Sequence, residues 1–258
     1  MVARRNKLND NQIKLLQLLY KFRFVTAELV AEHKAIRRSA VNNGFTILLD
    51  QELIARHYEP SYKIQGKGAS YYLTPKAIRL LRDSYKLNET TLRTMLKNKR
   101  LSEFFVKHNL TIMAVYLKLR GAYPDIFNVF SKSELGDFDY FPEPKPDLYL
   151  SRRKPGGNAH NEYMLDIFSD NRLFIIKKRI DVYIDHYDSG DWGEEEYPTI
   201  LLVCSDSRTE QRTQKYVESL LEDFDFLTTT KSALLDKHNK ETAIWTDVFN
   251  PEKLIALG

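Results

Sequence analysis

Three predicted helices followed by a predicted hairpin, all within the first 86 residues, constrain the fold more than any other feature of this sequence. Asn9 or Asp10 can cap the first helix, and Thr26 can cap the second. The third helix is predicted over residues 35–51. Apolar residues at helical spacing give two of these helices a face to bury. They are Ile13, Leu16 and Leu19 in the first helix, and Val41, Phe45, Leu48 and Leu49 in the third.

The predicted hairpin consists of two strand-like segments, LIARHYE and SYYLT. Between them lies SYKIQGKG, in which the glycines permit a turn. After the second segment, Thr74 and Pro75 offer an N-cap and a first helical position. Three helices followed by a hairpin are the order of elements in a winged helix, so we expect this fold for residues 1–86.

The third predicted helix has a polar face opposite its apolar one. In a winged helix the third helix enters the major groove of DNA, and the hairpin touches the phosphate backbone. Arginine is suited to guanine and asparagine to adenine. We therefore predict DNA contacts from this helix and, in the turn of the hairpin, from Lys63 and Lys67. The predicted contacts on the helix are Arg37, Arg38, Ser39, Asn42, Asn43 and Thr46.

The charge of the chain is divided unevenly between its two halves. Residues 1–120 contain 23 Lys and Arg against 9 Asp and Glu, a net charge of +14. Residues 121–258 contain 16 against 26, a net charge of −10. This division suggests two modules with different partners, and the basic half is a candidate for binding nucleic acid. The alternative is a solvated basic surface that binds no ligand.

The C-terminal half alternates predicted strands and helices. FNVF, DLYL, EYMLDIF, TILLVC and TAIWTD have the character of strands. LFIIKKRIDVYIDHY and SRTEQRTQKYVESLLED have the character of helices. This alternation predicts an α/β sheet with helices packed against it over residues 121–258. Residues 87–120 are expected to form a helical connector that opens this second domain.

Composition argues against a membrane or secreted protein. No apolar run approaches the roughly 18–20 residues that cross a bilayer, and MVARRNKLND lacks the apolar core of a secretory signal. The single cysteine, Cys204, lies in the apolar run ILLVC and excludes an internal disulfide framework. We expect it to be a buried small apolar residue, and we expect the protein to be cytoplasmic.

Several short segments follow one another along the chain: LLQLLYKFRFVTAELVAEH, SYYLTPKAIRLL, KHNLTIMAVYLKL, KPDLYL, EYMLDIF, KKRIDVY, YPTILLVCSD and FDFLTTT with the later IW. In their order and spacing they resemble the replication-relaxation family. The resemblance implies an N-terminal winged helix and a C-terminal domain similar to the PD-(D/E)xK nuclease fold. It also implies DNA binding linked to replication or mobilisation of plasmids and other mobile elements.

The nuclease resemblance directs attention to Asp147 and Asp166, which could hold Mg²⁺ as catalytic and metal-binding residues. Strand alternation places Asp166 and Phe168 on one face. The nuclease pattern has a lysine where Phe168 stands, so we expect the domain to be inactive. Lys178, or its neighbour Lys177, is the remaining candidate for the missing lysine.

The alternative for these acids is structural: they cap strand ends or pair with Arg152 or Arg153. A second departure from a common pattern concerns the hairpin. Winged helices often have a glycine before the first strand of the hairpin, and here that residue is Glu52. With glutamate in place of glycine, the sequence alone does not determine the shape of the turn before the hairpin.

The function predicted from these features is that of a DNA-binding protein of a plasmid or other mobile element, acting in replication or mobilisation. Two alternatives remain: a metal-dependent DNA endonuclease of the PD-(D/E)xK type and a winged-helix transcription regulator. No cofactor is expected unless the nuclease-like site is active, in which case it is Mg²⁺. The expected partners are double-stranded DNA, a relaxase or replication initiator, and a second copy of the chain.

Overall fold

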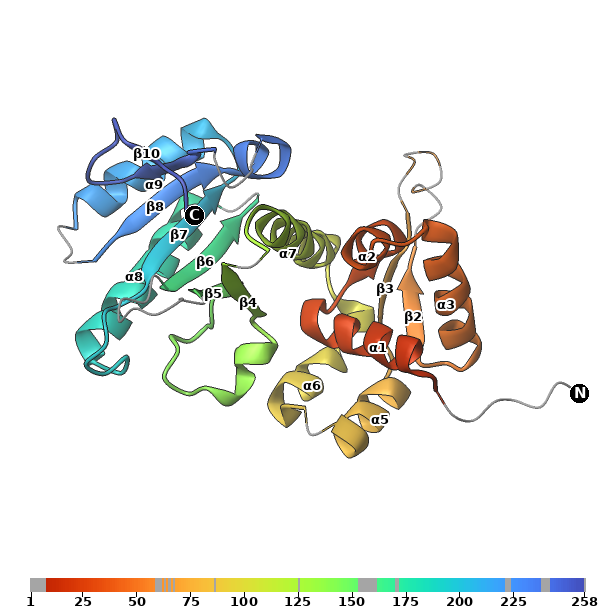
Figure 1. Ribbon diagram of the computed structural model, residues 1–258. Coiled ribbons are helices and arrows are strands. Elements are labelled where there is room, and N and C mark those ends of the chain that lie inside the picture. The colour runs from red at the N-terminus through yellow and green to blue at the C-terminus, as the bar shows by residue number, and fades with distance from the viewer. Residues whose placement is uncertain are drawn as a thin grey trace, which may run out of the picture. The chain divides into compact units, whose positions relative to one another are not determined.

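The computed structural model divides into two compact units, residues 1–113 and 114–258. Figure 1 shows the helix-rich first unit in red to yellow and the second unit, built around a sheet, in green to blue. The residues that the structure describes are 8–58, 62, 64, 66, 68–85, 87–124, 126–152, 162–169, 172–220, 224–237 and 242–257.

The first unit has the order of elements that the sequence predicts. Three helices precede the β2–β3 hairpin, and β1, which lies between α1 and α2, adds a third strand, so that the antiparallel sheet has the order β1-β3-β2. The elements are α1 (Asp10–Phe22), β1 (Val25–Thr26), α2 (Ala27–Lys34), α3 (Arg38–Asp50), β2 (Ile54–His57) and β3 (Ser70–Leu73). Further along the chain lie α5 (Pro75–Tyr85), α6 (Glu89–Met95), η1 (Asn98–Arg100) and α7 (Glu103–Ala122).

Side-chain caps fix where these helices begin. Asn9 forms a capping box with Gln12, in which each side chain accepts a hydrogen bond from the other residue's backbone. The hydroxyl of Thr26 accepts from the backbone of Leu29, and the hydroxyl of Thr74 accepts from Ala77 at 3.3 Å. All three caps are confirmed as the sequence predicts them.

The apolar faces of α1 and α3 form part of the first unit's core. The predicted residues Leu16, Leu19, Val41, Phe45 and Leu48 are all buried. Two other residues expected in these stripes, in α1 and α3, are only half-buried: Ile13 and Leu49.

α3 is shorter than the predicted span of 35–51. Ala35 adopts the left-handed conformation with φ 52° and ends α2, since its backbone N–H bonds back to that helix. Arg37 is extended and stands at the N-cap, and the right-handed helix α3 begins at Arg38.

Glu52 occupies the left-handed region with φ 57°, directly before β2. This is the conformation for which glycine is normally used, because other residues incur a steric cost there. Leu53 donates a backbone hydrogen bond to Leu48 across the turn. The turn before the hairpin therefore keeps a shape that glycine would favour, although Glu52 forms it.

The segment expected to be a connector packs largely with the first unit. Arg23, at the end of α1, donates hydrogen bonds to the side chain of Asn98 and the carbonyl of Thr94. Its guanidinium lies 4.8 Å from the ring centroid of Phe105, and burial lowers the pKa of Arg23 to about 10. The division between the units falls within α7, after Met113, and not at the limits of 86 and 120 predicted from the sequence.

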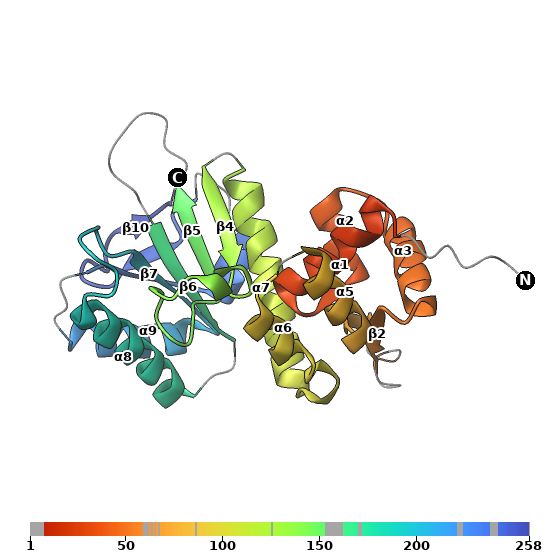
Figure 2. The same ribbon diagram turned by 90° about the horizontal axis from the view of Figure 1, so that it is seen from below.

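The second unit is built on a seven-stranded sheet of order β10-β9-β8-β7-β6-β5-β4. β4, β5 and β6 form an antiparallel meander, whereas β6, β7 and β8 run parallel. The strands are β4 (Phe127–Ser131), β5 (Leu148–Arg152), β6 (Glu162–Phe168), β7 (Thr199–Cys204), β8 (Phe226–Thr230), β9 (Trp245–Asp247) and β10 (Leu254–Ile255). Figure 2 shows β4 to β7 side by side.

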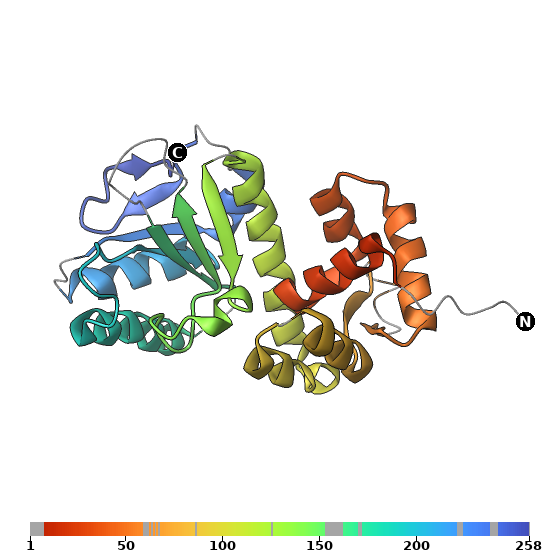
Figure 3. The same ribbon diagram turned by 60° about the horizontal axis from the view of Figure 1, so that its bottom comes forward.

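Two helices supply the parallel connections, α8 (Leu173–Ser189) between β6 and β7 and α9 (Ser207–Glu218) between β7 and β8. Both pack on the same face of the sheet, as Figure 3 shows. Ile176 and Ile180 of α8 and Val217 of α9 join Met164 and Phe168 of β6 in one buried cluster. Burying this apolar area is the main source of the unit's stability.

The first unit has the element order of a winged helix and the second is an α/β domain, as the sequence predicts. The likeness of the second unit to the PD-(D/E)xK nuclease fold stays a prediction. Cys204, at the end of β7, is fully buried as predicted. In the described part of the chain, no helix combines the length and the apolarity that crossing a membrane requires.

Candidate functional site

The polar face of α3 is open to solvent. Its opposite face is held in the core by Val41, Phe45 and Leu48. The 3.6-residue period of the helix therefore turns the intervening polar side chains outward. All six residues predicted to contact DNA from this segment are exposed: Arg37, Arg38, Ser39, Asn42, Asn43 and Thr46.

Local contacts orient part of this face. The guanidinium of Arg38 lies 2.8 Å from a carboxylate oxygen of Glu28, on α2. The hydroxyl of Thr46 donates to the backbone carbonyl of Asn42 at 3.0 Å. The two lysines predicted to contact phosphates from the hairpin, Lys63 and Lys67, lie outside the described residues.

Arg56, on β2, is a further exposed cation that the sequence analysis did not single out. It pairs in register with Tyr71 of β3. The ring of Tyr71 lies 4.1 Å, centroid to centroid, from that of Phe45 on α3. Arg56 is therefore carried on the hairpin close to the predicted recognition helix. The arginine in LIARHYE was the available signal, because a cation on the first strand of a wing suits a phosphate contact.

The second candidate site contains Asp147 and Asp166, which the fold does bring together. The backbone N–H of Asp147 donates to one carboxylate oxygen of Asp166 at 3.1 Å. The carboxylate of Asp147 in turn accepts from the backbone of Ile167 at 3.0 Å. Both aspartates are buried, so each carboxylate serves to join β6 to the segment that leads into β5.

The cation that reaches these acids is Arg179 of α8. Its Nε donates to the carboxylate of Asp166, and another of its nitrogens donates to the carbonyl of Pro144. Tyr183, one turn further on, donates its hydroxyl to the same carboxylate at 2.8 Å and accepts from Arg179. Burial acts to lower the pKa of Arg179, but Asp166, Tyr183 and Asp147 outweigh it and raise that pKa above the ordinary arginine value.

Neither lysine considered as a replacement catalytic residue points to this pair. Lys178 is exposed, and the ammonium of Lys177 lies 4.2 Å from the ring centroid of Tyr216 on α9. Phe168 belongs to the buried apolar cluster beneath α8. The alternative partners Arg152 and Arg153 have side chains outside the described part of the structure, and the described partner of Asp166 is Arg179.

This arrangement does not fit a divalent metal. Mg²⁺ requires several oxygen ligands at short distance, including carboxylates free to bind it. Both oxygens of Asp166 already accept hydrogen bonds, and a permanently charged guanidinium neutralises it. Among the residues that the structure describes, no group of three or more His, Cys, Asp or Glu could hold a metal ion. The geometry is that of a buried ion pair.

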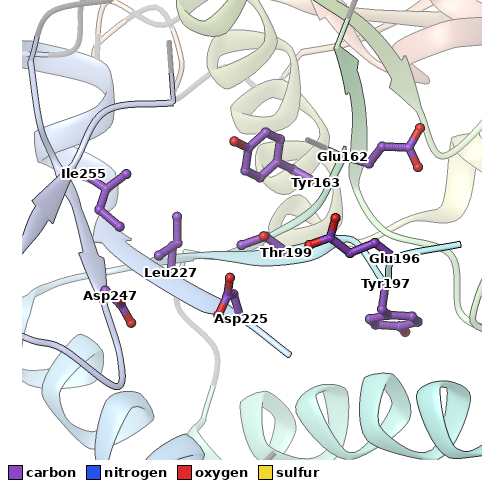
Figure 4. Close-up of a pocket in the computed structure, with 9 residues that line it drawn as sticks. All are labelled: Glu162, Tyr163, Glu196, Tyr197, Thr199, Asp225, Leu227, Asp247 and Ile255. Atoms are coloured by element: carbon purple, nitrogen blue, oxygen red, sulfur yellow. The ribbon is translucent and has the colours of Figure 1, made fainter. Parts of the chain in front are cut away.

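A separate pocket of about 210 Å³ lies in the second unit, at the edge of the sheet where β6, β7 and β8 begin. Burial, followed by the charges of Asp247 and Glu196, raises the pKa of Asp225 above its usual value. Figure 4 shows Glu162 and Asp247 on opposite sides of the pocket, with Glu196 and Asp225 between them. The remaining lining residues are Tyr163, Tyr197, Thr199, Leu227 and Ile255.

Comparison with known proteins gives one extensive match. The sequence profile of the replication-relaxation family matches residues 16–160, more than half of the chain. No curated protein sequence matches.

Two solved structures show weak likeness. A mutant of ZitR from Lactococcus lactis is 23% identical with a TM-score of 0.28, covering 42% of this chain and 71% of its own. The restriction endonuclease FokI bound to DNA is 10% identical with a TM-score of 0.29, covering 91% of this chain and 45% of its own.

Proposed function

Because the chain belongs to the replication-relaxation family, we propose that it binds a specific site in double-stranded DNA during replication or mobilisation of a plasmid or other mobile element. The polar face of α3 would enter the major groove, and the hairpin would contact phosphates on one side of it. The proposal does not depend on catalysis by the second unit.

The observation that supports this function most directly is the orientation of α3. Its three apolar anchors are buried while six polar side chains, from the N-cap residue Arg37 to Thr46, remain exposed. Arginine and asparagine can each form two hydrogen bonds with a base edge, to guanine and adenine respectively. The net charge of +14 over residues 1–120 adds attraction to phosphates.

We assign a different role to the second unit. Residues 121–258 carry a net charge of −10, which opposes a close approach to DNA phosphates. The acids that resemble a nuclease site are committed to Arg179 and to backbone groups. We infer that this unit is an inactive nuclease-like scaffold that contacts another protein, namely a relaxase, a replication initiator or a second copy of the chain.

The experiment that tests DNA binding is selection of bound sequences from a random pool of duplex DNA by the full chain. A defined motif should emerge. Asn42→Ala should then reduce the ratio of specific to non-specific affinity by about five- to 150-fold, the range for one good base contact. Asn11→Ala is the matched control, because Asn11 is an exposed asparagine on α1 and is not among the predicted DNA contacts.

Two results would contradict the proposal. One is failure of the pool to converge on any sequence at physiological salt. The other is equal behaviour of the Asn42 and Asn11 variants on the selected site. Raising the salt concentration should weaken binding by the wild-type chain to all duplexes, because each phosphate contact releases counterions.

A further inference from the structure

Glu28 is an acidic residue in the middle of a surface proposed to bind a polyanion. It lies in the first turn of α2, and its Oε1 is 2.8 Å from Nη2 of Arg38. The two side chains are 45% and 59% exposed. An ion pair this exposed contributes little to folding stability, and a carboxylate in the first turn of a helix adds only about 0.3–1 kcal/mol.

The same carboxylate also lies against the base of the hairpin. A Cβ added to Gly68 would stand 3.1 and 3.2 Å from the two oxygens of Glu28, which is closer than ordinary van der Waals contact. The lack of a side chain at Gly68 therefore lets the returning chain pass directly over Glu28. The carboxylate thus connects the end of the wing to the recognition helix through Arg38.

Tyr71, on β3, is near the same pair. Burial is the main cause that raises the pKa of its hydroxyl above the ordinary value. The charges of Arg56, Glu28 and Arg38 also act on it, so the hairpin, α2 and α3 all contribute charged groups to one small region. In that region Glu28 is the acid that contacts Arg38.

We propose that Glu28 is a positioning residue that holds Arg38 in the orientation needed to read a base, and that it does not itself contact DNA. This inference rests on the proposed function. A long arginine side chain loses much rotational freedom when it binds, and an ion pair already formed in the free protein reduces that loss. A guanidinium has five N–H donors, so one bond to Glu28 leaves donors for guanine O6 and N7.

The negative charge of Glu28 also disfavours phosphates nearby. Glu28 therefore has opposite effects on two kinds of binding. It supports the base contact of Arg38, and it weakens the sequence-independent binding to the DNA phosphate backbone. A residue that only stabilised the fold would change both kinds of binding together. This difference in sign makes the proposal testable.

The test compares affinities of the full-length protein for its selected site and for an unrelated duplex, measured by fluorescence anisotropy. Glu28→Ala should reduce the ratio of the two affinities by about fivefold or more, the lower end of the range for one base contact. Affinity for the unrelated duplex should stay equal or rise. Glu28→Gln, which keeps a hydrogen-bond acceptor, should give an intermediate ratio.

Two controls separate position from charge and from folding. Glu32→Ala removes the same charge from an exposed position on the same helix and should leave the ratio unchanged. In an Arg38→Ala background, Glu28→Ala should reduce the ratio no further, because the group that it positions is gone. Thermal unfolding of the single variants should match that of the wild-type protein.

The proposal is overturned if Glu28→Ala keeps or raises the ratio, if Glu32→Ala lowers it equally, or if the effect of Glu28→Ala persists without Arg38. If the wild-type chain shows no preference for any duplex, the proposed function itself fails. If the wild-type chain is specific and Glu28→Ala is equally specific, only the positioning role fails.

Discussion

Arg179 of α8 and Asp166 of β6 form an ion pair inside the second unit, with each residue more than nine-tenths buried. Removing one member of such a pair leaves an uncompensated charge in the interior. Arg179→Met should therefore lower the free energy of unfolding by about 3–5 kcal/mol, as measured by urea denaturation. Lys178→Met, at the exposed neighbouring position, should change it by no more than about 0.5 kcal/mol. Equal losses in the two variants would show that the pair has no special role.

The buried pair also leads to a prediction about catalysis. Purified protein should not nick or cut supercoiled, linear or single-stranded DNA in the presence of Mg²⁺ or Mn²⁺. Asp166 is occupied by Arg179, and Phe168 cannot supply the positive charge that stabilises a phosphoryl transition state. Metal-dependent cutting that disappears in both Asp166→Ala and Lys178→Ala would refute this expectation. Cutting that survives both substitutions would point to a contaminating nuclease.

Glu52 offers a test of backbone strain. Its φ of 57° lies in the left-handed region, which costs a residue with a Cβ roughly 1–2 kcal/mol. Glycine avoids this cost but has a more flexible unfolded state, so Glu52→Gly should raise the free energy of unfolding by about 0.5–1 kcal/mol. Glu52→Ala is the control: it keeps the strain and removes the same long exposed contact to Lys76. A gain equal in both variants would assign the effect to the side chain instead of the backbone.

Cys204 should be unreactive in the native protein. Burial is the main cause that raises the pKa of its thiol to about 12, so the reactive thiolate is scarce at pH 8. A thiol reagent such as Ellman's reagent should label it only after unfolding in guanidinium chloride. Rapid stoichiometric labelling without denaturant would mean that β7 opens readily or that the thiol is accessible.

The elements that sequence predicted best are those with local causes. Asn9, Thr26 and Thr74 cap their helices because the capping oxygen and the N–H that it accepts from are three residues apart. EYMLDIF and TILLVC are strands over the predicted residues. The start of α3 was placed too early, since nothing in the composition around Ala35 indicates a left-handed residue.

Arg179 was missed because its role depends on a residue distant in sequence. The nuclease pattern contains a lysine, and the run KKR offers Lys177 and Lys178 for it. The buried side of α8 includes Ile176, Ile180 and Tyr183, and Arg179 lies on this side by helical spacing. A charged side chain within an apolar stripe needs an oppositely charged partner in the interior, because an unpaired buried charge is costly. Asp166 on β6 is the candidate that the sequence offers.

The order in which the strands are synthesised leaves one edge of β6 unpaired and prone to aggregation. Its antiparallel neighbour β5 precedes it, but its parallel neighbour β7 begins at Thr199, 31 positions after Phe168. On the ribosome, one edge of an otherwise apolar strand therefore stays open while α8 is made, and open edges are sites of aggregation. Asp166 places a charge within that strand, and Arg179, which pairs with it, emerges only 13 residues later. We expect this carboxylate to act as a gatekeeper in the nascent chain before it becomes part of the folded interior.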